Sequence, residues 1–473
     1  MLETINNSKK PQKSRTGMLT VLENCRVSPP PTTVGERSLP LTFLDMLWIP
    51  FFPIHQVFFY EFSHSREHLL ETIVPNLKHS LSITLQHFFP FAGNLIVFLN
   101  PSVEKNPEIR HVEGDSVAVT VAECTLDFND LTGNHPRKCD MFYPLVPLLG
   151  RAEKVSDYLT IPLFSVQVTL FPNSGISIGL TNHHTLCDAS TRYNFLKAWS
   201  SIAIHGTDEL FLASGSVPFY ERVVKYPSSL DKIALNLPGI PAINAEYQPP
   251  QLVSHTDKVR ATIILTQAHI SRLKKQLSTQ LPTLEYVSSF SVACSFMWRC
   301  IAKSHVHIGE RKGDDDIERF VCAVDWRSRL DPPLPQTYFG NCVGASITTT
   351  IKSTLLAGNN GFLMAVELFG KALSETIKKK NGVIEDGESL IKKAFAPVPG
   401  VSVSGTPKTK IYDVDFGWGK PKKHETISID HNGSISVNAS KESPADIEIG
   451  VSLPAKQMDA FMSIFSEELE GTI

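Results

Sequence analysis

The spacing of apolar residues in the first half of the chain predicts helices and strands. One buried helix face is marked by apolar residues at three- and four-residue intervals: Val74, Leu77, Leu81, Leu85 and Phe88. Residues 163–180 read as two strands joined by a turn at 172–175, and a second helical pattern follows from about 189 to 202. The first half therefore predicts a mixture of both kinds of element.

The second half repeats this mixture. Strand patterns cover residues 259–265, 319–325 and 343–351. Helical patterns cover residues 267–277, 288–304 and 363–378. Farther along we expect a hairpin of strands 425–430 and 434–439 around His431-Asn-Gly433, then a strand at 447–453 and a helix from about 455. Helices and strands in both halves indicate an α/β fold.

Between these halves the periodicity fades, from about residue 206 to 257. Six prolines accumulate there: Pro218, Pro227, Pro238, Pro241, Pro249 and Pro250. Because such stretches commonly connect domains, we expect an N-terminal domain at 17–215, a crossover linker at 216–257 and a C-terminal domain at 258–473. Residues 1–16 are polar and basic, so we expect them to be disordered.

Composition and charge narrow the class of partner. The 473 residues carry 45 Lys and Arg against 48 Asp and Glu, and this balance provides no basic field for a phosphate backbone. We therefore expect a small-molecule partner and no nucleic acid. The eight cysteines form no CxxC pair, and no apolar run reaches the ~18 residues of a membrane span. These features predict a cytoplasmic protein with reduced thiols and no membrane partner.

Candidate chemistry begins where an apolar strand ends at His184, with Asp188 four residues later. Histidine suits proton removal near pH 7. Asp188 could fix the loop, either by bonding to the imidazole or by anchoring the loop to an arginine. The alternative interpretation is structural: a histidine satisfied by backbone groups and an aspartate that caps the next helix.

Three other motifs compete in the same region. Ser177 lies in a GxSxG pattern typical of serine hydrolases, but its alternating apolar neighbours predict a position within a strand. Cys187 could be a nucleophile, although a packed thiol is the simpler interpretation. His183, His184 and Asp188 could hold a metal ion, but adjacent residues of an extended strand point to opposite faces. We therefore expect no metal site.

Two further segments carry polar residues in unusual surroundings. Asp415-Phe-Gly417-Trp418-Gly419 predicts a tight loop with side chains in fixed positions, or a structural turn in which Trp418 fills the core. Arg327 follows a predicted strand. An arginine there is most often solvated, but it is also the natural bidentate partner of a buried carboxylate.

Taken in order, three motifs resemble the plant BAHD acyl-CoA-dependent acyltransferases: His184-Thr-Leu-Cys-Asp188, Tyr338-Phe-Gly-Asn341-Cys342 and Asp415-Phe-Gly-Trp-Gly419. The resemblance covers nearly the whole chain. The second motif and Leu41-Thr-Phe-Leu-Asp45-Met-Leu-Trp48 resemble the subgroup that acylates anthocyanin and other flavonoid or phenolic glycosides.

The resemblance implies a fold like that of chloramphenicol acetyltransferase: two α/β domains with mixed sheets and a solvent channel between them. It implies transfer of a malonyl or hydroxycinnamoyl group from CoA to a sugar hydroxyl of the glycoside in a ternary complex. Acyl-CoA is then a co-substrate, no cofactor is bound, and a monomer is expected. The alternatives are a non-glycoside alcohol or amine acceptor, an esterase, or a non-catalytic binding protein on the same fold.

The resemblance also implies roles for individual residues. His184 is the general base, and Asp415 is often grouped with it as catalytic, although it is also thought to organise the channel wall. Asp188 is structural and pairs with an arginine, for which Arg327 is the candidate. Three further residues are expected to support the site: Asn341, Gly417 and Trp418.

Two residues are candidates for contact with the acyl donor. The indole N–H of Trp418 is a candidate donor to the oxyanion that forms at the thioester carbonyl. Arg192, one helical turn after Asp188, is a candidate partner for a malonyl carboxylate. The alternative for Arg192 is an ion pair with Asp188, or solvation.

Overall fold

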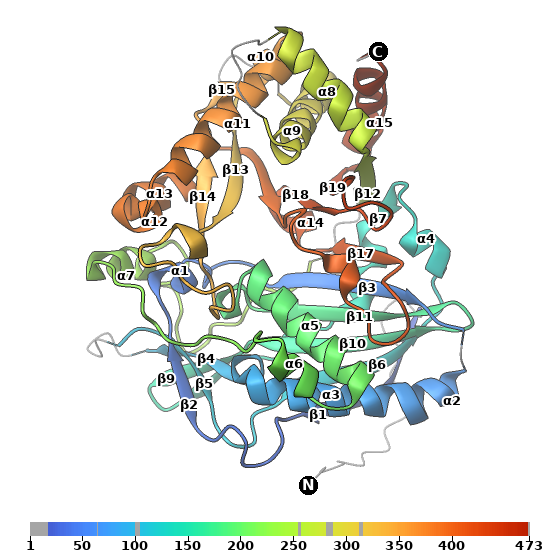
Figure 1. Ribbon diagram of the computed structural model, residues 1–473, viewed down its shortest axis with the longest axis vertical. Coiled ribbons are helices and arrows are strands. Elements are labelled where there is room, and N and C mark those ends of the chain that lie inside the picture. The colour runs from blue at the N-terminus through green and yellow to red at the C-terminus, as the bar shows by residue number, and fades with distance from the viewer. Residues whose placement is uncertain are drawn as a thin grey trace.

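A computed structural model describes residues 18–63, 65–99, 105–253, 257–280, 287–311 and 316–471. The segment 1–16, expected to be disordered, lies outside these residues. In Figure 1 the first half of the chain, blue to green, forms the lower part of the molecule, and the second half, yellow to red, forms most of the upper part.

A six-stranded sheet runs through the lower part. In spatial order its strands are β1 (Leu19–Val27), β6 (Val117–Cys124), β10 (Phe164–Phe171), β11 (Gly175–Asn182), β3 (Ile54–Glu61) and β17 (Lys423–Thr426). β10 and β11 pair antiparallel, which confirms the strands and turn predicted between 163 and 180. Every residue of both strands is buried, because side chains cover both faces of the sheet.

Two helices pack on one face of this sheet and confirm the two helical patterns of the first half. They are α3 (Val74–His87) and α5 (Ala189–His205). Asp188 starts α5, since its side chain accepts a hydrogen bond from the backbone of Thr191 at 3.0 Å. Gly206, with φ of +73°, ends it. The opposite face is covered by residues 144–148, whose carbonyls accept hydrogen bonds from Gln167 and Ser165.

A smaller sheet and several short helices complete the lower part. The strands are β2 (Arg37–Pro40), β5 (Glu108–His111), β4 (Asn94–Phe98), β9 (Tyr158–Pro162) and β8 (Glu153–Val155). The short helices are α1 (Phe43–Met46), α2 (Arg66–His68), α4 (Phe128–Thr132), α6 (Glu209–Ala213) and α7 (Ser228–Leu235). The boundaries of the crossover linker at 216 and 257 stay a prediction; among its described residues α7 is the single helix.

The upper part contains the second large sheet. In spatial order its strands are β14 (Val343–Ile347), β13 (Ile317–Asp325), β16 (Gly400–Ser404), β18 (Ser434–Ala439), β19 (Ile447–Pro454), β12 (Lys258–Leu265) and β7 (Arg137–Lys138), with β15 (Ile351–Lys352) beside β13. Its long helices are α8 (Gln267–Gln280), α9 (Ser289–Ile308), α11 (Gly361–Lys378) and α15 (Ala455–Glu470). Its short helices are α10 (Ser353–Ala357), α12 (Gly382–Glu385), α13 (Gly387–Ala394) and α14 (Ile429–Asn432). These elements confirm the predicted strands and helices, except that the strand at 343–351 is divided in two.

The hairpin predicted at 425–439 is wrong. β17 pairs with β3 in the lower sheet, whereas β18 pairs with β16 and β19 in the upper one. Between them the chain forms α14, which Gly433 ends with φ of +66°. Asp430 in this helix is fully buried and lies 3.4 Å from Arg260 of β12. The segment therefore turns away from β17 because its acidic residue is held by the upper sheet.

The two parts of the molecule exchange strands. β17 reaches down to β3 (Figure 1), and β7 of the first half pairs with β12 of the upper sheet. Buried ion pairs join the exchanged strands: Glu425 lies 2.9 Å from Arg137 and 3.2 Å from Arg260. Burial alone would raise the pKa of Glu425, but the two arginines outweigh it and lower that pKa to about 2.

Candidate active site

His184 lies in a short turn directly after β11, against an aromatic wall. Its ring stacks on the indole of Trp48, with 3.8 Å between centroids and 6° between planes, and the ring of Phe51 lies 6.4 Å away. Burial lowers the pKa of His184 to about 3, so the ring is neutral. Nδ1 is buried, which leaves Nε2 as the ring nitrogen that a substrate can reach.

Asn341 holds the backbone of this turn. Its side-chain amide donates to the carbonyl oxygens of His184 and Thr185 at 3.1 and 3.2 Å. Asn341 itself is fully buried, and its backbone N–H donates to Asp45 at 2.7 Å. The histidine is therefore fixed by a residue from the second half of the chain.

Asp188 faces Arg327, and the ion pair that the resemblance implies is present. Nη1 of Arg327 donates to Asp188 at 2.8 Å, and both side chains are almost fully buried. The same carboxylate accepts the backbone N–H of Cys342 at 3.1 Å. Burial would raise the pKa of Asp188, but Arg327 outweighs burial and holds that pKa below its usual range. Asp188 thus anchors the histidine loop to the second half of the chain.

Arg192 is a partly buried cation beside this loop. It donates to the side-chain oxygen of Asn182 at 3.4 Å. Within the part of the chain that the structure describes, no carboxylate pairs with it, because Asp188 is bound to Arg327. Burial lowers the pKa of the Arg192 guanidinium, and its charge in turn helps to lower the pKa of His184. The ion pair with Asp188 considered above is therefore not formed.

Asp415 and Trp418 lie in a loop near the other end of β3 from His184. Trp418 packs against Tyr60, with 5.5 Å between ring centroids, near the far end of β3. His184 follows Asn182, which pairs with Ile54 at the opposite end of that strand. Six residue steps of β3, or about 20 Å of strand, separate Ile54 from Tyr60, so Trp418 packs beside the end of β3 that is remote from His184.

Asp415 instead closes its own loop. Its carboxylate accepts the backbone N–H groups of Gly417 at 2.7 Å and Gly419 at 3.0 Å. Both glycines have left-handed backbones, with φ of +95° and +90°, which other residues rarely adopt. The loop lies beside the C-terminal end of α5, where a Cβ on Gly417 would lie 3.7 Å from Ile204.

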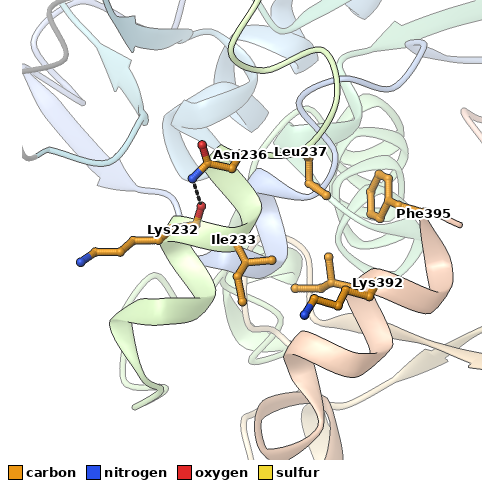
Figure 2. A pocket seen from close by; sticks show the side chains of 7 residues that line it. Lys232, Ile233, Asn236, Leu237, Lys392 and Phe395 are labelled. Atoms are coloured by element: carbon orange, nitrogen blue, oxygen red, sulfur yellow. Dashed lines mark hydrogen bonds between the residues drawn. The ribbon is translucent and has the colours of Figure 1, made fainter.

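An open groove begins on the other side of the aromatic wall. It has a volume of about 430 Å³ and lies between α7 and α13, as Figure 2 shows. Its lining residues are Lys232, Ile233, Asn236, Leu237, Ile391, Lys392 and Phe395. The ring of Phe395 lies 5.7 Å from that of Phe51, which connects the groove to the surroundings of His184. The groove combines apolar walls with two lysines.

The competing motifs do not form sites. Ser177 lies inside β11, as the alternating pattern predicts, and not at a sharp turn; it is also fully buried. Burial raises the pKa of the Cys187 thiol to about 12. Searched over its described residues, the chain has no cluster of His, Cys, Asp or Glu that could hold a metal ion.

The sequence patterns did not identify Asp45 and Trp48 as members of the site. Both lie in the segment quoted for the subgroup resemblance, which was the one available signal. Their contacts with Asn341 and His184 join positions that are far apart in sequence. Helical or strand periodicity carries no information on such contacts.

Comparisons with known proteins identify the family of this chain. The model of the Transferase family matches residues 18–468. Malonyl-coenzyme A:anthocyanin 3-O-glucoside-6''-O-malonyltransferase of Dahlia pinnata is 56% identical over 457 residues, which cover 96% of this chain and 98% of that protein. Phenolic glucoside malonyltransferase 1 of Nicotiana tabacum is 39% identical and aligns with 89% of this chain and 92% of its own length.

Solved structures show the same fold. Vinorine synthase matches with a TM-score of 0.66 at 19% identity, covering 96% of this chain and 98% of that one. TRI101 of F. sporotrichioides, complexed with coenzyme A and T-2, matches with a TM-score of 0.63 at 14% identity, covering 92% and 98%. The expectation of a two-domain α/β fold with mixed sheets is confirmed.

The fold, the histidine loop and these relatives define an acyltransferase that uses acyl-CoA as its co-substrate and moves groups other than aminoacyl groups. The chain belongs to the BAHD acyltransferase family. Within its described helices, none is both long and apolar enough to cross a membrane.

Proposed function

We propose that this enzyme transfers a malonyl or hydroxycinnamoyl group from CoA to a sugar hydroxyl of an anthocyanin, flavonoid or other phenolic glycoside. The 56% identity with a malonyltransferase whose name specifies an anthocyanin 3-O-glucoside supports the acceptor class. A relative named as a coumaroyltransferase, 33% identical, keeps the aromatic donor in the proposal. The observation that carries the donor choice is Arg192, a cation beside His184 without a carboxylate partner in the described chain.

His184 acts as the general base. Its neutral ring takes the proton of the sugar hydroxyl on Nε2 while the hydroxyl oxygen attacks the thioester carbonyl. The tetrahedral intermediate then collapses, the C–S bond breaks, and the imidazolium returns the proton to the sulfur of CoA. Both substrates meet in one ternary complex, so no acyl-enzyme forms and proximity supplies much of the rate.

Asp188 and Asn341 keep the histidine in place without touching the substrates. Asp188 is bound to Arg327, and Asn341 binds the backbone of His184. We assign Asp415 and Gly417 to the order of the loop beside α5, because the carboxylate is occupied by backbone N–H groups of that loop.

Arg192 pairs with the malonyl carboxylate. A guanidinium offers two parallel N–H groups to a carboxylate, and a partly buried site strengthens this pair. An uncharged coumaroyl group gains nothing from the same cation. The geometry therefore favours malonyl-CoA over aromatic acyl-CoA as the donor.

The groove between α7 and α13 holds the acceptor's aromatic aglycone. Its volume of about 430 Å³ lies in the range of small-molecule sites. Ile233, Leu237 and Phe395 offer apolar surface to a flat ring system (Figure 2). Phe395 lies next to Phe51, whose ring is 6.4 Å from that of His184. The attached sugar then extends to the histidine.

The remaining parts of the proposal concern the whole protein. We infer two domains at 17–215 and 258–473 joined by the crossover linker, with a solvent channel between them. We also infer a cytoplasmic monomer that binds neither nucleic acid nor membranes. The near-neutral charge supports the expectation of no nucleic-acid partner.

The products of a simple incubation test the proposed function. The protein is mixed with malonyl-CoA or p-coumaroyl-CoA and a panel of flavonoid glucosides, aglycones and amines. The masses of the products are then measured by mass spectrometry. We expect the mass of one malonyl group to be added to the sugar of a glucoside. Acylation of aglycones or amines alone would favour the non-glycoside alternative, and release of free acid without transfer would favour an esterase.

A further inference from the structure

Asp45 is a buried carboxylate that joins two distant segments. It lies in α1 and is fully buried. Its Oδ2 accepts hydrogen bonds from the backbone N–H and the hydroxyl of Thr42, at 3.0 and 2.8 Å. Its Oδ1 accepts the backbone N–H of Asn341 at 2.7 Å, across 296 positions of sequence. The carboxylate therefore uses one oxygen for its own helix and the other for the segment that carries Asn341.

The approach of these two segments is specific. Gly340 has φ of +112°, and a Cβ at this position would lie 2.9 Å from Oδ1 of Asp45. Only glycine satisfies both conditions. Arg222 of the crossover linker adds a cation, 3.6 Å from Asp45, and donates to the carbonyl of Phe339 at 2.6 Å. The charge of Asp45 is thus balanced at the point of contact.

Asn341 connects Asp45 to the backbone of His184. Its amide nitrogen lies 3.3 Å from Oδ1 of Asp45 and donates to the carbonyls of His184 and Thr185. One turn after Asp45, the indole of Trp48 stacks on the imidazole itself. The segment from Asp45 to Trp48 therefore constrains both the backbone and the ring of His184.

We propose that Asp45 is a positioning residue for His184, acting through Asn341. The inference rests on the proposed role of His184 as general base. Asp45 and Asp188 hold consecutive N–H groups, those of Asn341 and Cys342, so the two carboxylates fix the loop from opposite sides. Because general-base catalysis depends on closely held geometry, loss of this hold slows the chemical step and leaves substrate binding intact.

The test compares Asp45→Asn and Asp45→Ala with a control, Thr42→Ala. The control removes the hydroxyl bond to Oδ2 and leaves the link to Asn341. We expect kcat with malonyl-CoA and the best glucoside to fall on the order of 10- to 100-fold in Asp45→Ala, with both KM values little changed. Asp45→Asn keeps the side-chain size and should lose less. Thr42→Ala should lower Tm without a comparable loss of kcat.

A double variant separates positioning from general destabilisation. If Asp45 acts through Asn341, Asp45→Ala/Asn341→Ala should be no slower than Asn341→Ala alone. Losses that multiply, or a folded Asp45→Ala with normal kcat, would overturn the inference. If Asp45→Ala does not fold, the variants Asn341→Ala and Asp45→Asn test the inference instead. A normal kcat in both of these variants would overturn the inference. Turnover that survives His184→Ala would instead overturn the proposed function.

Discussion

At the scale of single residues, the site depends on buried charges that are paired and one that is not. Arg327 and Asp188 neutralise each other inside the protein, and their hydrogen bonds extend to Cys342, Tyr338 and Gly340. Arg192 has no such partner in the described chain. Removing a paired charge and removing the unpaired one should therefore have different consequences.

Asp188→Ala should destabilise the fold. It leaves the buried Arg327 without its counter-ion, which costs about 3–5 kcal/mol in comparable buried pairs. We expect lower Tm together with lost turnover, measured by calorimetry and a product assay on one preparation. The double variant Asp188→Ala/Arg327→Met should recover part of the Tm, because no unpaired cation remains. Lost turnover at an unchanged Tm would give Asp188 a chemical role instead.

Arg192→Ala should change the choice of donor. Because a charge-assisted bond of this kind contributes about 1.5–3 kcal/mol, kcat/KM for malonyl-CoA should fall about 10- to 100-fold, while p-coumaroyl-CoA is little affected. Lys197→Ala, an exposed cation farther along α5, serves as the control and should affect neither donor. Equal losses with both donors would show that Arg192 does not bind the malonyl group.

At the scale of elements, helix α5 separates the His184 motif from the Asp415 motif. α5 begins beside His184 and ends beside the loop of Asp415. The two motifs therefore lie at opposite ends of this 17-residue helix. At 1.5 Å per residue this is a separation of about 25 Å. The loop therefore meets α5 at the end of the helix that is remote from His184.

Asp415→Ala should lower stability and rate together. It removes two charge-assisted hydrogen bonds to Gly417 and Gly419, with a loss of about 2 kcal/mol in the free energy of unfolding. Asp415→Asn keeps an oxygen acceptor and should lose less of both. Thermal unfolding and kcat measured side by side check this relation. A large loss of kcat in Asp415→Asn with normal Tm would indicate a direct part in the chemistry.

At the scale of the whole molecule, neutral buried histidines make stability depend on pH. Burial lowers the pKa of His55 and His424 to about 3 and that of His183 to about 4. In the unfolded chain these residues take up protons near pH 6.5. Below that pH the unfolded state binds more protons than the folded state, so the free energy of unfolding falls as the pH falls.

The expected slope is steep. Each of these three histidines contributes about 1.4 kcal/mol per pH unit below pH 6.5, and His184, whose pKa burial also lowers to about 3, adds a contribution of the same size. Thermal unfolding between pH 8 and pH 5 should show a constant Tm at first and then a steep decline. His424→Gln removes one of these groups and should flatten the decline. A Tm that stays level down to pH 5 would contradict the buried, neutral state of these side chains.

Sequence patterns predicted the elements whose buried residues follow a regular spacing within one segment. α3 and α5 bury residues at the helical period, and the apolar residues of β10 and β11 alternate with polar ones along the sequence, so each element was visible in its own segment. The hairpin at 425–439 failed because alternation shows that a strand exists but not which strand it joins. β17 joins β3, which lies far back in the chain, and burial of Glu425 between Arg137 and Arg260 holds it there.

The residues of the site also fall into two groups, those that the sequence identified and those that it did not. His184, Asp188 and Arg327 could be singled out because motif and resemblance mark them. The distance between His184 and Asp415 could not be predicted, because it depends on which end of β3 each loop meets. Asp45 was also missed as a functional residue, since its part in the site depends on one contact with Asn341, 296 positions away.

In the proposed reaction the neutral imidazole of His184 removes the proton from the sugar hydroxyl, and the proposed function depends on this step. Its most direct test is single-turnover transfer from malonyl-CoA to a flavonoid glucoside by His184→Ala, with CoA binding measured by calorimetry. Because general-base catalysis typically contributes about 10²- to 10⁴-fold, the transfer rate should fall by at least about 100-fold while CoA affinity and Tm stay close to those of the unaltered enzyme. Transfer within about threefold of the unaltered rate would contradict this role of His184.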